Sequence, residues 1–244
     1  MAITSHQADE AFRDLEDYQR VPEGLNPPLR FPPYRSTMTR VPDRALVVQP
    51  HTLSELTGPV YAHRPIGPTD HDLTVQHAGP PVGERIIVHG RVVDGDGRPL
   101  RRTLVEIWQS NAAGRYRHDG DDGIAPLDPN FTGGGRTLTD DDGRYRFITV
   151  KPGPYPWKNH HNAWRPAHIH FSLFGPAFVT RLVTQMYFPG DPLFPFDPIL
   201  GSVPEATRPR LISRFDLDAG VPEESLAYRW DIVLRGPTAT PMER

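Results

Sequence analysis

The chain has 244 residues with no cysteine, 29 prolines and 21 glycines, and its formal net charge at pH 7 is −3. The missing cysteine excludes disulfides and thiolate metal sites, which limits a metal to His, Tyr, Asp or Glu ligands, and the absence of any block of like charge argues against a nucleic-acid partner. No apolar run is long enough to span a membrane and the first residues lack the regions of a signal peptide, so a soluble, cytoplasmic protein is expected.

The first 80 residues combine charged positions with proline-rich segments at 26–28 and 31–34 and show little periodicity apart from a short helical pattern at 11–19. Such a composition suits a segment that lies over a neighbour better than one that builds its own core. We therefore interpret residues 1–80 as an N-terminal arm that packs on the body of the protein and on a partner chain.

From residue 84 onward the sequence consists of short runs rich in β-branched residues, separated by Gly, Pro and Asp turns. The expected strands are 85–93, 103–109, 144–150, 167–174, 180–188 and 228–234, with a weak helical pattern at 209–215. Short β runs without long intervening helices indicate an antiparallel sandwich or barrel. We expect an all-β fold in which residues 81–244 form one antiparallel β-sandwich domain with long loops.

One expected strand carries two histidines in alternation with apolar residues. On a strand, His168 and His170 share one face, while Ala167, Ile169 and Phe171 share the other. Both imidazoles can then reach one ion while the opposite face anchors the strand in the core. By itself the pair is equally compatible with two polar residues on a strand.

Two tyrosines are further candidates for metal ligands. Tyr155 stands between Pro154 and Pro156, and proline restricts both its own backbone and that of the residue before it, so the position of Tyr155 is stiffened from both sides. Tyr116 follows a glycine-containing turn. Taken alone, Tyr155 is also compatible with an aromatic cap on the core, and Tyr116 with an ordinary loop residue.

Together and in this order, these segments resemble the intradiol dioxygenase family. The matching segments are 83–88, 114–118, 151–157, 165–171 and 227–236, so the resemblance extends over most of the chain. Within the family, the pattern is most similar to the iron-carrying beta chains that act on protocatechuate.

The resemblance implies that one non-haem ferric ion per chain is held by Tyr116, Tyr155, His168 and His170, with a solvent hydroxide as the fifth ligand. The donor types suit that ion, since phenolate oxygens are hard anionic ligands and imidazole commonly binds iron. A free tyrosine titrates near pKa ~10, so ionising two phenols at neutral pH needs a nearby positive charge, which a metal supplies.

The reaction implied is ring cleavage of protocatechuate (3,4-dihydroxybenzoate) by dioxygen, giving 3-carboxy-cis,cis-muconate in the beta-ketoadipate pathway of aromatic catabolism. Tyr155 matches the ligand that the substrate displaces and that takes up a catechol proton. Arg165 matches an arginine that stabilises negative charge developing on the ring. Gln185 matches a second polar residue near the substrate.

The resemblance also implies a substrate pocket and a partner. Trp157 and Ile199 match apolar walls of the pocket, although both would look the same as core residues. Tyr34 in the arm matches a tyrosine that helps to bind the ring carboxylate. An alpha chain of the same fold is expected to complete the pocket in an alpha–beta hetero-oligomer.

Three other interpretations remain open at this point. The first is a non-catalytic sandwich subunit, which the presence of all four ligand positions disfavours. The second is a related enzyme for catechol or hydroxyquinol, whose N-terminal helical domain the proline-rich arm does not resemble. The third is a zinc or copper hydrolase that uses the histidine pair, and the colour of the protein would distinguish it because zinc gives no visible band.

Overall fold

The computed structural model describes residues 22–44, 65–174 and 182–243. The helix expected at 11–19 lies outside these residues. Within the described ranges the two α-helices, α2 (Ser36–Arg40) and α4 (Pro198–Ser202), have five residues each. No described helix is long and apolar enough to cross a membrane. The frequent prolines and glycines therefore have the expected effect of keeping the helices short.

The first sheet is formed around a long central strand, β1. Its members are β1 (Arg85–Val93), β4 (Arg144–Val150), β9 (Arg214–Phe215), β10 (Leu226–Arg229) and β11 (Ile232–Val233). The order is β11-β1-β10-β9, and β4 pairs with β1. The pairing of β1 with β4 is antiparallel, whereas β10 and β11 run parallel to β1. The sheet is thus mixed, an addition to the antiparallel pattern expected from the sequence.

The single strand expected at 228–234 is divided into β10 and β11. The interruption lies at Trp230, whose backbone N–H donates to the His89 carbonyl at 2.8 Å. A methyl group on Gly90 would lie only 1.8 Å from the Trp230 carbonyl oxygen, so the two backbones touch at this point. Glycine is required there because any side chain would separate the two segments.

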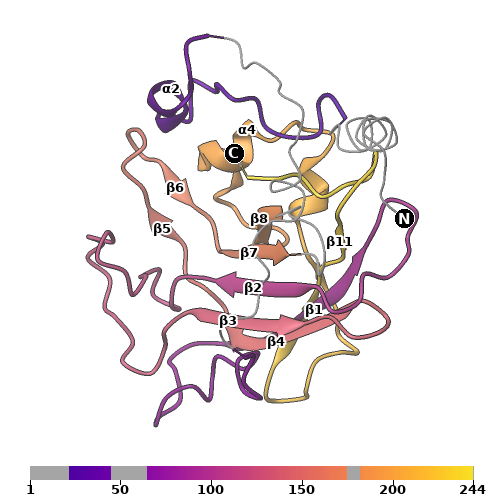
Figure 1. Ribbon diagram of the computed structural model, residues 1–244. Helices are drawn as coiled ribbons and strands as arrows, with labels where there is room; N and C mark the ends of the chain where they lie inside the picture. The colour runs from indigo at the N-terminus through magenta and orange to yellow at the C-terminus, as the bar shows by residue number, and fades with distance from the viewer. Residues whose placement is uncertain (1–21, 45–64, 175–181, 244) are drawn as a thin grey trace, which may run out of the picture.

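The second sheet is antiparallel throughout. It contains β2 (Leu104–Trp108), β3 (Gly134–Leu138), β7 (His168–Phe174) and β8 (Leu182–Tyr187) in the order β3-β2-β7-β8. Strand β3 was not expected from the sequence because its two glycines have low β propensity, and its backbone pairing with β2 forms it nonetheless. A two-stranded hairpin, β5 (Tyr155–Pro156) with β6 (Trp164–Arg165), leads into β7 (Figure 1).

The hydrophobic core lies between the two sheets. Phe171 of β7 contacts Tyr145 and Phe147 of β4, with ring centroids 5.8 and 6.4 Å apart, and it contacts Trp230 at 4.8 Å. Ile169 and Leu173, two residues to either side of Phe171, are fully buried. These contacts across the two inner faces confirm the all-β sandwich.

The helix expected at 209–215 is present only in its first part. A short 3-10 helix, η2 (Arg208–Leu211), is followed by β9. The backbone N–H and the hydroxyl of Ser213 both donate to the Tyr187 carbonyl, at 2.8 and 2.9 Å. Pairing with the end of β8 therefore draws the chain into an extended conformation. A second 3-10 helix, η1 (Phe194–Phe196), precedes α4.

The described part of residues 1–80 makes specific contacts with the sandwich. The backbone N–H of Leu73 donates to the Ile148 carbonyl at 2.8 Å, and the Leu73 side chain is fully buried. Asn159 accepts from the backbone N–H of Arg35 at 2.8 Å and donates to the Pro33 carbonyl at 2.6 Å. The boundary at residue 80 between arm and domain stays a prediction.

We predict that Phe171→Ala lowers the free energy of unfolding by about 3–5 kcal/mol, because it leaves a cavity between the sheets. Chemical denaturation measures the change. The matched control is Phe215→Ala, whose side chain is 49% exposed; it should cost less than about 1.5 kcal/mol. Equal losses for the two variants would contradict the location of the core.

Candidate metal centre

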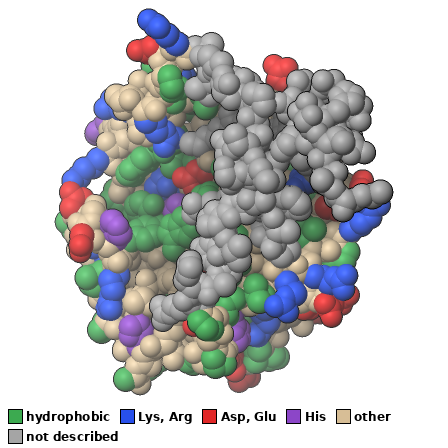
Figure 2. Space-filling view, in the orientation of Figure 1, with side chains coloured by type: hydrophobic (Ala, Val, Ile, Leu, Met, Phe, Trp, Pro, Cys, Tyr) green, Lys and Arg blue, Asp and Glu red, His purple; other side chains and the backbone are tan. Residues whose placement is uncertain are grey.

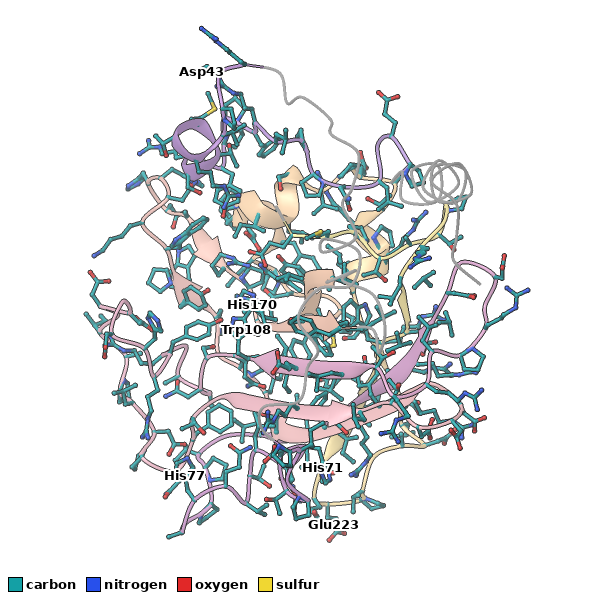
Figure 3. All side chains as sticks on the ribbon, viewed as in Figure 1. Asp43, His71, His77, Trp108, His170 and Glu223 are labelled. Atoms are coloured by element: carbon teal, nitrogen blue, oxygen red, sulfur yellow. The ribbon has the colours of Figure 1, made fainter. Side chains whose placement is uncertain are left out.

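The outer face of the second sheet carries the two histidines. Ile169 and Phe171 point into the core, so His168 and His170 face away from it, as the alternation predicts. The strand register places Tyr187 opposite His168 and Gln185 opposite His170. On the other side, the Trp108 ring stacks on the His170 ring at a centroid distance of 4.8 Å (Figure 3). A row of polar and aromatic side chains thus crosses β2, β7 and β8.

Tyr155 reaches this face from the hairpin that precedes β7. In the register of β5 and β6, Tyr155 lies opposite Arg165. Because β6 continues through Pro166 into β7, the hairpin brings Tyr155 and Arg165 next to His168 over a short length of chain. The Tyr155 and His168 ring centroids are 5.7 Å apart.

Tyr116 comes from a loop that is tied to the Tyr155 segment. The side chain of Asn111 accepts from the backbone N–H groups of Ala113 and Arg115, each at 2.9 Å, which shapes the turn before Tyr116. The Asn111 carbonyl also accepts from the backbone N–H of Gly153 at 2.9 Å. Asn111 therefore fixes the two tyrosine-bearing segments relative to each other.

The side chains of the four candidate ligands lie close together. The Tyr116 and Tyr155 hydroxyls lie 3.4 and 3.5 Å from Nε2 of His168. The His168 and His170 ring centroids are 4.9 Å apart, and the Tyr116 and Tyr155 centroids are 5.6 Å apart. Nδ1 of His168 lies 2.7 Å from the Pro166 carbonyl. Because a carbonyl accepts only, Nδ1 carries the proton and the Nε2 lone pair faces the two phenols.

His170 lies beside a carboxylate that the sequence did not point to. Oε2 of Glu243 lies 3.5 Å from Nδ1 of His170, a buried atom for which no aligned hydrogen bond is formed. Burial by itself would raise the pKa of Glu243, but His170, Gln185 and Arg165 lower it to about 2. Glu243 is therefore an anion behind His170, the position in which metal-binding histidines are commonly supported.

The electrostatics of the cluster suit a cation. Burial lowers the pKa of His168, with a further contribution from Arg165, and burial also lowers the pKa of His170, although Glu243 acts in the opposite direction. Both imidazoles are therefore neutral at pH 7 and their lone pairs are available. Burial raises the pKa of Tyr116 and of Tyr155. Within the described residues, no group of three or more His, Asp and Glu side chains could hold a metal. A metal here would thus need the phenol oxygens, and ionising them needs its charge.

Arg165 lies beside the cluster and is 4% exposed. Its NH2 group donates to Oε1 of Gln185 and lies 3.5 Å from the Tyr187 hydroxyl. Burial by itself would lower the pKa of Arg165, but Asp197, with smaller contributions from Tyr187, Tyr155 and Tyr116, raises it overall, so the guanidinium is charged. The cluster is therefore bordered by a fixed positive charge.

The remaining predicted site residues surround Arg165. Trp157 lies with its ring centroid 5.8 Å from the guanidinium carbon, and the edge of the Tyr34 ring meets Trp157 at 5.4 Å. Ile199 lines a small cavity together with Gln185. Figure 2 shows hydrophobic side chains gathered on this face, with basic, acidic and histidine side chains among them, where β5, β6 and β7 lie in Figure 1. The structure thus brings every predicted site residue into one region, while their roles stay predictions.

Four neighbours of the cluster were missed by the sequence reasoning. They are Trp108, Tyr187, Asp197 and Glu243. Two had a local signal: Tyr187 shares a strand face with Gln185, and Asp197 precedes a proline at the start of a helix, a typical N-cap position. Trp108 and Glu243 had none, because only strand pairing and the return of the chain bring them to His170.

This chain is an all-β sandwich that places two phenols and two neutral imidazoles beside a buried arginine. That arrangement is the one expected of a non-haem metalloenzyme. The family model described as Dioxygenase matches residues 56–236, and the model described as Protocatechuate 3,4-dioxygenase beta subunit N terminal matches residues 18–52. The chain belongs to the intradiol dioxygenase family, which confirms the resemblance seen in the sequence.

Individual relatives agree with this membership. The chain is 58% identical to the protocatechuate 3,4-dioxygenase beta chain of Burkholderia cepacia over 90% of this chain and 94% of the relative. The alpha chain of that enzyme from the same organism is 32% identical, over 65% of this chain and 76% of the relative. Among solved structures, 3-chlorocatechol 1,2-dioxygenase from Rhodococcus opacus matches with a TM-score of 0.53 and 26% identity, over 75% of this chain and 71% of that one.

We predict that Gly114→Ala perturbs the cluster beyond the usual effect of alanine at a positive φ. Gly114 has φ +80°, and a methyl group there would lie 2.3 Å from the Pro154 carbonyl oxygen, next to Tyr155. Gly97 is the control, because it has φ +81° with no atom within 4 Å. Gly97→Ala should cost about 1–2 kcal/mol of unfolding free energy, and Gly114→Ala should cost more and raise hydrogen exchange at 111–116. Equal costs would contradict the close approach of the two loops.

Proposed function

We propose that this chain is the iron-carrying beta chain of a protocatechuate 3,4-dioxygenase. It holds one non-haem ferric ion through Tyr116, Tyr155, His168 and His170. The observation that carries the proposal is the convergence of these four side chains, with both tyrosine hydroxyls within 3.5 Å of Nε2 of His168. Its context is a chain 58% identical to a beta chain of that enzyme.

The donor set fits a trivalent ion. Two phenolates and a solvent hydroxide balance three positive charges, and two neutral imidazoles complete the ligands without adding charge. The protonated Nδ1 of His168 and the carboxylate of Glu243 near Nδ1 of His170 leave Nε2 of both rings as the free nitrogen. Binding of the ion by these four side chains explains why two tyrosines and two histidines are buried together.

A ferric ion held by Tyr116, Tyr155, His168 and His170 would make the catechol ring reactive toward dioxygen. The reaction adds both atoms of dioxygen to protocatechuate and cleaves the bond between the two hydroxyl-bearing carbons, which yields 3-carboxy-cis,cis-muconate. Tyr155 is the ligand that substrate binding would free, and its phenolate oxygen would take up one catechol proton. The rigid backbone between Pro154 and Pro156 returns Tyr155 to the same position after turnover.

The other side chains bind and orient the substrate. The Arg165 guanidinium stabilises negative charge that develops on the ring, in a site where water does not screen it. Gln185, which accepts a hydrogen bond from Arg165, holds it there. Trp157 and Ile199 form apolar walls, and Tyr34 contributes to binding the ring carboxylate.

The partner is an alpha chain of the same fold, which completes the carboxylate end of the pocket in an alpha–beta hetero-oligomer. The 32% identity to an alpha chain supports a common fold for the two subunits. Residues 1–80 form the arm that packs on the sandwich and on this partner, and residues 81–244 form the catalytic domain.

We predict that the purified complex is red-brown, because tyrosinate-to-iron charge transfer absorbs visible light, and that it contains about one iron per chain. His168→Ala should lose the iron and the colour, as metal analysis and absorption spectra will show. His161→Ala is the matched control, because His161 is exposed in the loop before β6, and it should keep both. A colourless protein that retains zinc after reconstitution with iron would refute the ferric site.

We further predict that co-expression with the alpha chain gives a stable complex that prefers protocatechuate to catechol. The chain alone should be poorly soluble or weakly active, since part of the carboxylate site is missing. Light scattering and dioxygen uptake with the two substrates measure mass and preference. A fully active homo-oligomer that prefers unsubstituted catechol would be incompatible with the heteromer and with the substrate.

A further inference from the structure

A single buried carboxylate joins two parts of the proposed pocket. Asp197 is 2% exposed and lies between η1 and α4. Its Oδ1 lies 3.2 Å from Nε of Arg165, and its Oδ2 accepts from the Tyr187 hydroxyl at 3.1 Å. Its Oδ1 also accepts from the backbone N–H of Ile199 at 2.9 Å, which caps α4. The proposed charge and the proposed apolar wall therefore share one anchor.

Arg165 depends on this anchor for its counter-charge. Two of the described side chains that contact the guanidinium, Gln185 and Tyr187, are neutral. Tyr187 stays protonated because burial and the nearby Asp197 carboxylate raise its pKa. Nε of Arg165 is buried and faces Asp197 without an aligned hydrogen bond. Among the described residues, Asp197 is the carboxylate in ion-pair contact with this guanidinium. A buried cation is displaced, or admits water, when a contacting anion loses its charge.

Tyr187 closes the network. Its hydroxyl contacts Asp197 at 3.1 Å and Oε1 of Gln185 at 2.9 Å, and Gln185 in turn accepts from Arg165. Four side chains from β6, β8 and the start of α4 thus hold one another. Because each member is buried, a change in one position moves the others rather than being absorbed by solvent.

We propose that Asp197 is a positioning residue that holds the Arg165 guanidinium at the ring site and, through the N-cap of α4, sets the Ile199 wall at the same time. The inference rests on the proposed function, because it assigns the task of Arg165 to the reacting ring. Among the described residues, the polar contacts of the Asp197 side chain are with Arg165, Tyr187 and the backbone of Ile199, and none is with a candidate ligand. The charge of Asp197 acts on turnover through Arg165, whereas its acceptor oxygen acts on the position of Ile199.

The test uses Asp197→Asn in the alpha–beta holoenzyme. Asparagine keeps the size and the acceptor for the Ile199 N–H but removes the charge. We expect kcat on protocatechuate to fall between about 10- and 100-fold, because a misplacement of about 1 Å at a reacting centre has an effect of this order. The KM should change much less than kcat, because the lost interaction acts in the transition state, and iron content and the visible spectrum should stay those of the wild type.

A double-mutant cycle with Arg165→Ala separates positioning from general damage. If Asp197 acts through Arg165, adding Asp197→Asn to Arg165→Ala should change kcat by less than about threefold. Full activity of Asp197→Asn, loss of its iron, or fully additive effects would each overturn the proposal.

Asp70→Asn is the control. Asp70 also pairs with an arginine Nε, at 2.8 Å, and accepts a backbone N–H, but it lies away from the site. This variant should keep the wild-type kcat.

A crystal structure of Asp197→Asn provides a measurement that needs no activity. The Arg165 guanidinium should leave its wild-type position against Trp157, and an unmoved guanidinium would overturn the proposal. If the wild-type complex neither binds iron nor consumes dioxygen, the proposed function fails, while the displacement of Arg165 still decides whether Asp197 positions it.

Discussion

The alternation of side chains along β7 is the constraint on which both the fold and the candidate site depend. Ile169 and Phe171 fill the core between the sheets, and this fixes the register and the direction of the strand. Because the period of a strand is two residues, His168 and His170 must then face the opposite side together. A shift of one residue would place both imidazoles in the core and both apolar side chains in the site.

Two other segments bring the candidate tyrosine ligands to the histidines of β7. The β5–β6 hairpin brings Tyr155, and the loop organised by Asn111 brings Tyr116. Burial of these polar side chains costs free energy unless they are hydrogen-bonded or bind an ion. Stability does not account for the concentration of phenols, imidazoles and one guanidinium in this region, and such a concentration is typical of a functional site.

The proposed function requires side chains in fixed positions rather than many contacts. Arg165 is held by Asp197 and Gln185, while His170 lies between Trp108 and Glu243. Each of these two side chains thus has neighbours that restrict its rotation. Rigid placement lets electrostatic stabilisation act without reorganisation at the moment of reaction.

The sequence by itself determined the β class, the face that His168 and His170 share, and the candidate tyrosines, because period-two patterns and proline restraints are local properties. It did not reveal β3, the division at Trp230, or the early end of the helix expected at 209–215. Those features depend on backbone contacts between segments distant in the chain. For the same reason, only the tertiary structure brought Glu243 to His170 and Asp197 to Arg165, since a buried charge finds its partner through folding and leaves no spacing in the sequence.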